Sequence, residues 1–364
     1  MFELVVLVAA GALAVLMIYW FVILIKTLTF KPSSKKSQSV SVIVCTHNEL
    51  SNLKKLIPSL LSQNHPDFEV IIVDDRSDDG TYDFLLENQS DQLKFARVDQ
   101  VHDHINAKKF ALTMGIKAAK HDILLFTDAD CTPNNSNWIN EMTGSFNQDT
   151  EFTLGISPYS QSKGLLGQFI QFETHWTAMN YIGFALAGNP YMGVGRNIAY
   201  RKSTFLDHKG FSKIQHITGG DDDLLVNDLA HKRNTKVVMG ADSLTFSLPK
   251  QTWSEYLKQK TRHWSVGKYY RLKDKFLLGL QNYANLVFWL ALIILAVQAN
   301  NYIIPAGMLI FRMLFITILV NLTSKKFGYR MNIWLVPMMD ILYVFYASIF
   351  GTIALFTKKV KWKK

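Results

Sequence analysis

Two acidic clusters contain the residues of this sequence that are best suited to chemistry. In the first, Asp128 and Asp130 flank Ala129 and follow the apolar run 123–127. Residues i and i+2 of a strand point to the same side, so both carboxylates can reach one cation. Mg²⁺ and Mn²⁺ prefer oxygen ligands, and such an ion usually holds a phosphate as well. The spacing therefore predicts that Asp128 and Asp130 bind Mg²⁺ or Mn²⁺ beside a phosphate.

The second cluster consists of Asp221, Asp222 and Asp223, which precede a segment with a helical pattern, 224–230. Adjacent carboxylates disfavour simultaneous ionisation, so the pKa of one of them should be raised, as suits a general base. Aspartate is also a frequent N-terminal helix cap, and the cluster could serve that purpose instead. The residues by themselves leave both interpretations open.

Short apolar runs alternate with helical patterns in the first third of the chain. The strand candidates are 40–45, 70–73, 93–98 and 123–127, and the helix candidates between them are 49–61, 82–88 and 107–120. This alternation predicts an α/β fold with a doubly wound, mostly parallel sheet that binds ligands at the carboxyl ends of its strands. The sequence has no Walker-type loop and no G-x-G-x-x-G, which disfavours an ATPase, a phosphotransferase or a dinucleotide-binding enzyme.

The N-terminal segment 4–25 is an uncharged apolar run of 22 residues. A helix needs about 20 such residues to cross a bilayer. A signal peptide is the alternative, but its apolar region would be shorter and basic residues would precede it. The basic residues instead follow the run, as Lys26, Lys31, Lys35 and Lys36. Because basic flanks stay on the cytoplasmic side, we expect a retained membrane anchor and a cytoplasmic chain after it.

The other membrane-like segments lie near the C-terminus, at 279–297, 302–322 and 333–356. They contain Arg312 and Asp340, which could pair, because ionisable residues at membrane depth are costly when alone. Three full crossings after a cytoplasmic domain would place the lysine-rich tail 358–364 outside, against its basic bias. We therefore expect one of the three segments to be a re-entrant or surface helix.

These patterns divide the chain into an N-terminal anchor (1–30), a short linker (31–39), a cytoplasmic α/β domain (38–272) and a C-terminal membrane domain (276–364) with two to three membrane segments. The protein is expected to be a multi-pass protein of the cell membrane. Its net charge of +10 gathers beside the membrane segments, where it favours anionic lipid head groups. No basic stripe marks a soluble segment, so we expect no nucleic-acid partner. The two cysteines, Cys45 and Cys131, do not indicate a disulfide framework.

Five motifs follow one another along the chain. They are Thr46-His47-Asn48-Glu49, Asp74-Asp75, Asp128-Ala129-Asp130, Gly220-Asp221-Asp222 and Gln259-Lys260-Thr261-Arg262-His263-Trp264. In this order, flanked by membrane helices, they resemble the family 2 glycosyltransferases of the GT-A fold. The resemblance is to the membrane-bound branch that includes ceramide glucosyltransferase, hyaluronan synthase and cellulose synthase, and it covers about residues 40–270. It implies a nucleotide-sugar donor, with a UDP-sugar as the expected one.

The resemblance assigns the ends of the first two strands to the nucleoside. Asp75, with Asp74 beside it, would bind the base, since the uracil N3–H is a donor that a carboxylate can satisfy. Glu49 would contact the ribose or base, with Thr46 nearby as a further donor-binding candidate. The alternatives are ordinary ones, because aspartates also favour turns and a glutamate favours the first turn of a helix.

For the rest of the donor, the resemblance implies that Lys108, at the start of a predicted helix, counters the diphosphate. An ordinary solvated lysine is the alternative. Asp130 would bind the metal directly, and Asp128 would be shared between the metal, the ribose and the sugar. Asn197 would line the sugar pocket. A cation so placed neutralises the charge that grows on the departing nucleotide.

The reaction implied by the resemblance is a single in-line displacement that inverts the anomeric configuration. Asp222, with Asp221 beside it, would be the general base that deprotonates the acceptor hydroxyl. Gln259, Arg262 and Trp264 resemble a Q-x-x-R-W signature, whose arginine grips the donor diphosphate and whose tryptophan borders the acceptor. The resemblance thus makes Arg262 a donor-binding residue, with Gln259 and Trp264 on the acceptor side. His263 separates Arg262 from Trp264, and this insertion rotates the indole by about 100° on a helix. His263 itself could then face the acceptor or the metal.

Within this enzyme class, the number of membrane helices separates two functions. A processive polysaccharide synthase normally builds a channel for its polymer from more than four helices, so transfer of one sugar to a lipid or lipid-linked acceptor is the favoured function. Polysaccharide synthesis is the alternative within the class. A non-catalytic membrane protein that binds nucleotide-sugars is the alternative outside it, although all acidic positions of the motifs are filled.

Overall fold

The computed structural model describes residues 1–33, 36–100, 105–298 and 302–356, so Lys35 and the tail 358–364 lie outside the described residues. The described chain divides into two compact units. We call them the sheet unit, which comprises Lys31–Ser160 and Phe184–Pro249, and the helical unit, which comprises Met1–Phe30, Gln161–Gly183 and the described residues from Lys250 to Phe356.

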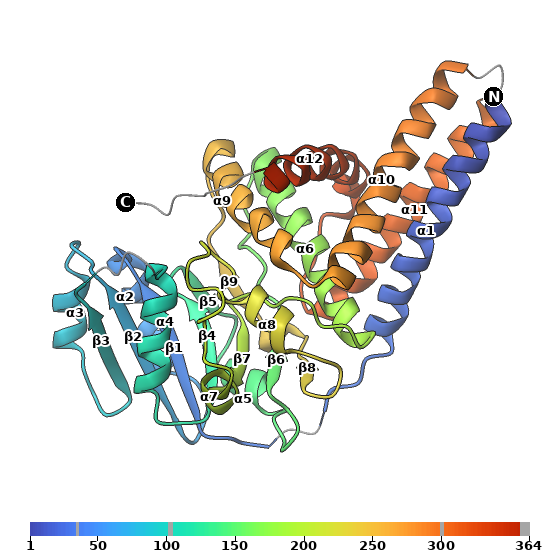
Figure 1. The fold of residues 1–364 in the computed structure, drawn as a ribbon. Coiled ribbons are helices and arrows are strands. Elements are labelled where there is room, and N and C mark those ends of the chain that lie inside the picture. Colours follow the sequence, from blue (N-terminus) through green and yellow to red (C-terminus); the bar gives the residue numbers. More distant parts are fainter. Residues whose placement is uncertain (34–35, 101–104, 299–301, 357–364) are drawn as a thin grey trace. The chain divides into compact units, whose positions relative to one another are not determined.

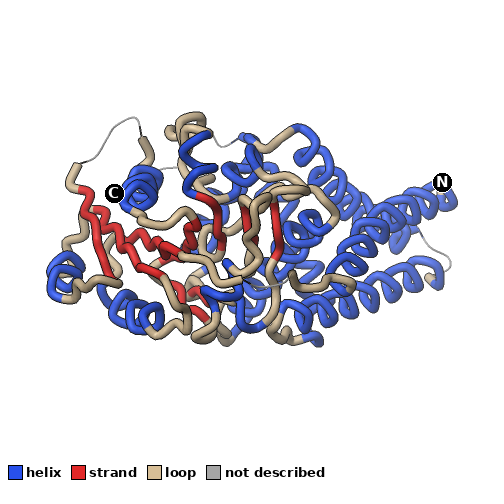
Figure 2. Tube along the Cα trace, turned by 90° about the horizontal axis from the view of Figure 1, so that it is seen from below, coloured by secondary structure: helices blue, strands red, loops and turns tan. Residues whose placement is uncertain are grey.

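The sheet unit is built on a seven-stranded sheet, which has the order β3-β2-β1-β4-β7-β6-β8 in the described chain. Its strands are β1 (Val40–Thr46), β2 (Phe68–Asp75), β3 (Leu93–Val98), β4 (Ile123–Asp128), β6 (Phe152–Leu154), β7 (Ile198–Arg201) and β8 (Thr235–Val237). The first four strands are parallel to one another, whereas β7 runs antiparallel to both of its neighbours, β4 and β6. A separate ribbon pairs β5 (Cys131–Pro133) with β9 (Thr245–Ser247). The predicted mostly parallel α/β sheet is confirmed, and Figure 2 draws it in red among blue helices.

Helices cover both faces of this sheet. They are α2 (Leu50–Leu61), α3 (Thr81–Glu87), α4 (Ala107–Ala118), α5 (Trp138–Thr143), α7 (Lys202–Asp207) and α8 (Asp223–Leu229), with a 3-10 turn η1 (Ala241–Ser243). Side chains alternate along a strand, so each face has its own apolar set. On one face, α2 and α5 pack against Val42, Val44 and Ile72. On the other, α4 lies so close to Ile43 and Val73 that Gly115 has no room for a side chain.

The carboxyl ends of β1, β2 and β4 lie next to one another. In the register of the sheet, Thr46 pairs with Asp74, and Cys45 pairs with Asp128. Polar residues that are far apart in the sequence are thereby gathered at one edge. This is the edge at which open α/β sheets bind their ligands.

The helical unit contains the long helices of the protein (Figure 1). They are α1 (Phe2–Leu28), most of α6 (Gly164–Leu186), α9 (Trp253–Val266), α10 (Leu272–Gln298), α11 (Ile303–Phe327) and α12 (Val336–Phe356), with 3-10 turns η2 (Gly267–Tyr269) and η3 (Ile333–Leu335). By length and composition, α1, α10, α11 and the segment Ile333–Ile353 could each cross a membrane. These helices indicate a membrane-associated protein.

The predicted pairing of Arg312 and Asp340 is confirmed. Arg312 Nη2 lies 2.8 Å from Asp340 Oδ2, and both side chains are buried between α11 and α12. Arg312 Nη2 also donates to Asn285 Oδ1 in α10 over 2.9 Å. The pair therefore ties three helices together in a place where an unpaired charge would be costly.

Candidate active site

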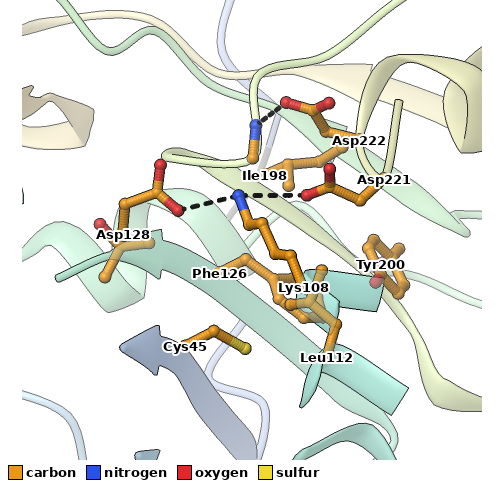
Figure 3. Close-up of a pocket in the computed structure, with 11 residues that line it drawn as sticks. Cys45, Lys108, Leu112, Phe126, Asp128, Ile198, Tyr200, Asp221 and Asp222 are labelled. Atoms are coloured by element: carbon orange, nitrogen blue, oxygen red, sulfur yellow. Dashed lines mark hydrogen bonds and ion pairs between the residues drawn. The ribbon is translucent and has the colours of Figure 1, made fainter. Parts of the chain in front are cut away.

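A pocket opens in the sheet unit at the carboxyl edge of the sheet (Figure 3). It is lined by Cys45, Lys108, Leu112, Phe126, Thr127, Asp128, Gly195, Ile198, Tyr200, Asp221 and Asp222. The lining includes members of both acidic clusters, which lie far apart in the sequence. Each cluster was predicted from its own residues, and the fold brings them together.

Lys108 joins the two clusters. Its Nζ lies 3.2 Å from Asp128 Oδ1 and 3.2 Å from Asp221 Oδ2, as the dashed lines of Figure 3 mark. Burial by itself would lower the pKa of Lys108, but the surrounding carboxylates outweigh burial and raise this pKa well above its usual value. Lys108 is therefore protonated, and its charge lies where an entering phosphate could take the place of a carboxylate partner.

In the first cluster, two partly exposed aspartates flank a buried alanine. Asp128 is the last residue of β4, and Asp130 lies in the turn before β5. Ala129 between them is buried, whereas both aspartates are partly exposed. The described residues include no group of three or more His, Cys, Asp or Glu side chains that could hold a metal. Two carboxylates nevertheless fit Mg²⁺ or Mn²⁺, because such an ion commonly takes its other ligands from substrate phosphates and water.

In the second cluster, two backbone N–H groups fix Asp222. The N–H of Gly195 donates to Asp222 Oδ2 over 2.5 Å, and the N–H of Asp223 donates to Oδ1 over 2.8 Å. Gly195 allows this close approach, since a Cβ there would lie only 3.1 Å from Oδ2. Asp222 is also the N-cap of α8. The capping interpretation is therefore correct, and it leaves the carboxylate with further lone pairs for a proton.

The two neighbouring carboxyl groups have opposite pKa shifts. Burial, together with repulsion from Asp221, raises the pKa of Asp222. Burial acts on Asp221 in the same sense, but Lys108 and Lys109 outweigh it and lower the pKa of Asp221. A carboxylate with a raised pKa is the better proton acceptor of the two. The environment thus favours Asp222 as the base.

Lys109 is a residue that the sequence analysis missed. Its side chain is buried, and its Nζ donates to the carbonyl oxygens of Ile217 over 2.6 Å and Gly219 over 2.5 Å. These carbonyls belong to the loop that leads into Asp221, and Gly219 there has a φ of +82°. Two lysines in the first turn of a helix oppose its dipole, which is the signal that could have drawn attention to the pair.

Replacing Lys109 by Met should lower both stability and turnover. The substitution leaves two buried carbonyl groups without a donor, which costs about 1–3 kcal/mol for each unsatisfied group. We expect a lower thermal midpoint and a lower kcat, with the KM for the donor changed less, because Lys108 is intact. Lys117→Met, at an exposed position of the same helix, is the matched control. Equal thermal midpoints for the two variants would contradict the role of Lys109.

The ends of β1 and β2 carry the residues expected to bind the nucleoside. Thr46 and Asp74 are buried, yet Thr46 Oγ1 and Asp74 Oδ2 lack a hydrogen-bond partner within the described chain. Buried polar atoms are rarely left unpaired, so two such atoms on paired strand ends are open to a ligand. Asp75 forms an ion pair with Arg76 at 2.8 Å. Glu49 is the N-cap residue of α2 and accepts from the Asn52 amide over 2.5 Å.

The structure places Asn197 away from solvent. Asn197 is fully buried, its amide donates to the carbonyls of Ile156 and Ser243, and its Oδ1 accepts from Trp138. The side chain therefore connects three segments by hydrogen bonds, and its NH2 group is occupied by the two carbonyls. The preceding residue, Arg196, was missed; its guanidinium stacks over Tyr159, and its buried Nη1 has no hydrogen-bond partner among the residues described.

The expected acceptor-side residues lie together in α9, within the helical unit. His263 is exposed, and its Nε2 lies 3.5 Å from Arg262 Nη2. Trp264 packs edge-on against Tyr346 of α12, with the ring centroids 6.0 Å apart. Gln259 Oε1 is buried without a hydrogen-bond partner among the described residues. Trp264 thus packs inside its own unit. This fits its place one residue beyond the signature position, which turns the indole by about 100° on the helix.

Known proteins resemble this chain in their sequences. A "Glycosyl transferase family 2" profile matches residues 41–208, and a "Glycosyl transferase family group 2" profile matches residues 136–354. The chain is 33% identical over 98 residues to glycosyltransferase AglE of Haloferax volcanii, which is 26% of this chain and 31% of the relative. It is 32% identical over 130 residues to the 4,4'-diaponeurosporenoate glycosyltransferase of Staphylococcus haemolyticus, which is 35% of this chain and 34% of the relative. Each match therefore spans about a third of the relative's length.

One solved structure resembles this one over nearly its whole length. It is the mannosyltransferase PcManGT of Pyrobaculum calidifontis in complex with GDP-Man and Mn²⁺, with a TM-score of 0.65, 16% identity, and coverage of 99% of this chain and 100% of that one. At this identity the similarity establishes the fold. Because one family profile extends over more than half of its length, this chain belongs to the family 2 glycosyltransferases and has their GT-A fold.

Proposed function

We propose that the protein is an inverting, cation-dependent glycosyltransferase that moves one sugar from a UDP-sugar to a lipid or lipid-linked acceptor at the cytoplasmic face of the membrane. One observation carries this proposal: Lys108 holds both acidic clusters around a single pocket. The donor diphosphate and the acceptor hydroxyl would then lie on opposite sides of the transferred sugar. That arrangement is what a single in-line displacement requires.

Each residue has a defined task in this mechanism. Asp222 accepts the proton of the acceptor hydroxyl as its oxygen forms a bond to the anomeric carbon, and the bond to the diphosphate breaks. Lys108 exchanges a carboxylate partner for the diphosphate and offsets its charge. Asp128 and Asp130 would hold Mg²⁺ or Mn²⁺, which supplies further positive charge to the leaving group. Asp74, Asp75 and Thr46 would hold the nucleoside.

Membrane helices support a lipid acceptor, because a lipid is presented in the plane of the bilayer in which they lie. The basic residues at the ends of these helices support a cytoplasmic catalytic unit. Lys26 ends α1, Lys273 and Lys275 begin α10, and Lys325 and Lys326 end α11. Such clusters stay on the cytoplasmic side. Arg262 of α9 is proposed to bind the diphosphate on the strength of its motif.

A set of nucleotide-sugars, offered one at a time as donors, tests this function directly. Purified protein in lipid vesicles is incubated with UDP-, GDP- and dTDP-sugars and Mn²⁺ or Mg²⁺, and the lipid extract is analysed by mass spectrometry. We expect a discrete glycolipid from a UDP-sugar. Turnover with a GDP-sugar alone would contradict a uracil nucleotide as the donor. A long polymer would contradict the transfer of a single sugar. Nucleotide-sugar binding without any turnover would indicate a non-catalytic protein.

A further inference from the structure

We propose that Arg196 is a donor-binding residue whose guanidinium pairs with an oxyanion on the sugar side of the bound nucleotide-sugar. Arg196 lies in the sheet unit, two residues before β7. The identity of its ligand rests on the proposed function, whereas the place of Arg196 follows from contacts within the sheet unit.

The register of the sheet places Arg196 beside the first acidic cluster. Strand β7 runs antiparallel to β4, and Phe126 pairs with Ile198. Asp128 lies two residues beyond Phe126, and Arg196 lies two residues before Ile198, so both lie at the same edge of the sheet. Phe126, Asp128 and Ile198 line the pocket, as does Gly195 (Figure 3). The backbone on either side of Arg196 is therefore part of the pocket wall.

The side chain of Arg196 lies near the ribbon that follows Asp130. Its guanidinium carbon is 4.5 Å from the centroid of the Tyr159 ring, and Tyr159 forms a β-bridge with Ser247. Ser247 pairs with Cys131 across the ribbon, and its Oγ lies 3.5 Å from Asp130 Oδ1. Tyr159 thus holds the positive charge of Arg196 on the side of the pocket where the cation is expected.

Arg196 differs from the other two cations of the site in its partners. Lys108 pairs with two carboxylates, and Lys109 donates to two carbonyl groups. Arg196 Nη1 is buried and has no hydrogen-bond partner within the described ranges. The Tyr159 ring compensates the charge only in part, because it accepts no conventional hydrogen bond from the guanidinium plane. Since buried donors are rarely left unpaired, Nη1 is available to an acceptor that a ligand supplies.

The order of the strands indicates which part of the donor supplies this acceptor. Along the edge, β2 and β1 end in the residues proposed for the nucleoside, and β4, which ends in Asp128, is followed by β7. Gly195, next to Arg196, donates its N–H to Asp222, the proposed base. Arg196 therefore lies on the sugar side of the cation site, beyond the nucleoside.

Two oxyanions of a nucleotide-sugar fit this position. One is the second phosphate, which the cation at Asp128 and Asp130 draws to the same edge, and the other is a carboxylate carried by the sugar. A guanidinium binds either group through two parallel N–H donors. The phosphate is the favoured ligand because every nucleoside diphosphate sugar carries it. Charge that remains on this phosphate when its bond to the anomeric carbon breaks is then stabilised by Arg196.

Nucleotide binding tests this role without any turnover. Calorimetry with Mn²⁺ compares the full chain in detergent micelles with its Arg196→Met variant for UMP, UDP, UDP-glucose and UDP-glucuronate. A hydrogen bond to a charged group is worth about 10–10²-fold in affinity. We expect the variant to bind UDP and both UDP-sugars more weakly by this factor. Its affinity for UMP, which lacks the second phosphate, should be unchanged.

The four ligands distinguish the two oxyanions from a failure of the proposal. A loss confined to UDP-glucuronate would assign Arg196 to a carboxylate of the sugar and would support its role in donor binding. Unchanged affinity for all four ligands, or an equal loss for UMP and UDP, would overturn the proposal. If the unaltered protein does not bind UDP, the uridine donor of the proposed function is wrong. The comparison is then made with GMP and GDP, which carry the same phosphates.

Thermal unfolding separates ligand binding from a structural role. Arg233→Met is the matched control, because Arg233 is exposed in the same unit and outside the pocket lining. Methionine can keep the contact with the Tyr159 ring, so we expect equal midpoints for the two variants without nucleotide. The rise in midpoint on addition of UDP should be smaller for Arg196→Met. A lower midpoint without nucleotide, together with an unchanged rise, would show that Arg196 only supports the fold.

Arg196→Lys keeps the proposal testable if the methionine variant does not fold. Lysine retains the positive charge but lacks the two parallel N–H donors. We expect it to weaken UDP and to leave UMP unchanged. The same affinity for UDP as in the unaltered protein would overturn the assignment of the guanidinium to an oxyanion of the donor.

Discussion

Replacing Asp222 by Asn should remove sugar transfer and leave donor binding nearly unchanged. Asparagine keeps the shape, and its single oxygen can still accept one of the two N–H groups, from Gly195 or Asp223, but it cannot take the proton of an acceptor hydroxyl. Positioned general bases contribute about 10²–10⁴-fold to rate, so kcat should fall by that factor. The dissociation constant of the nucleotide, measured by calorimetry with Mn²⁺ present, should change less than threefold, since Asp222 faces the acceptor in the proposed mechanism.

The control for this variant is Asp228→Asn on the same helix. Asp228 is half exposed and pairs with Lys213 at the surface, so its loss should leave kcat unaffected. If Asp222→Asn retained the kcat of Asp228→Asn, Asp222 would be only the helix cap that it also is. A parallel loss of nucleotide binding would place Asp222 on the donor side instead.

The pH dependence of kcat offers an independent view of Asp222. A base must be deprotonated to act, and burial and Asp221 raise the pKa of Asp222. Activity should therefore fall with decreasing pH along a limb that lies above the ordinary aspartate value of about 3.9. The rate of transfer at saturating donor, measured from pH 4 to 8, checks this. A rate that stays constant down to pH 4 would be inconsistent with a base of raised pKa.

Replacing Asp130 by Asn should remove most of the dependence on the divalent cation. One carboxylate ligand is lost, while the turn between β4 and β5 is preserved. Charge stabilisation by a bound cation is worth several kcal/mol, so transfer should fall by roughly 10²–10³-fold. Nucleotide affinity should also lose its response to Mn²⁺. Titration of each variant with Mn²⁺ under donor saturation measures both effects.

Asp149→Asn is the matched control, because Asp149 is exposed in the same unit and away from the pocket lining. Its response to Mn²⁺ should equal that of the unaltered protein. An Asp130 variant that kept the full response would show that the cation is held elsewhere. In that case Asp128 would serve as a partner of Lys108 alone.

The sequence by itself determined the secondary structure elements and the acidic motifs of this protein, but not which residues lie in contact. The first four strands and the helices between them follow from apolar runs and their spacing, because a buried strand and an amphipathic helix are periodic over a few residues. The acidic clusters were visible for the same reason, since carboxylates beside an apolar run contrast with it. The apolar segments of α1, α10 and α11 are set by composition. Helix α10 begins earlier, and α11 ends later, than the predicted bounds, because their polar end turns are helical although they are not apolar.

Tertiary structure decided which residues meet. Lys108, Asp128 and Asp221 come from three segments, and their contacts depend on the sheet order and on the loop before α8. The sequence marks Lys108 and Lys109 only as an unfavourable pair in the first turn of a helix, and the role of Lys109 becomes clear only from its two carbonyl acceptors. Asn197 fits a sugar pocket by position, but its burial assigns its amide to the protein.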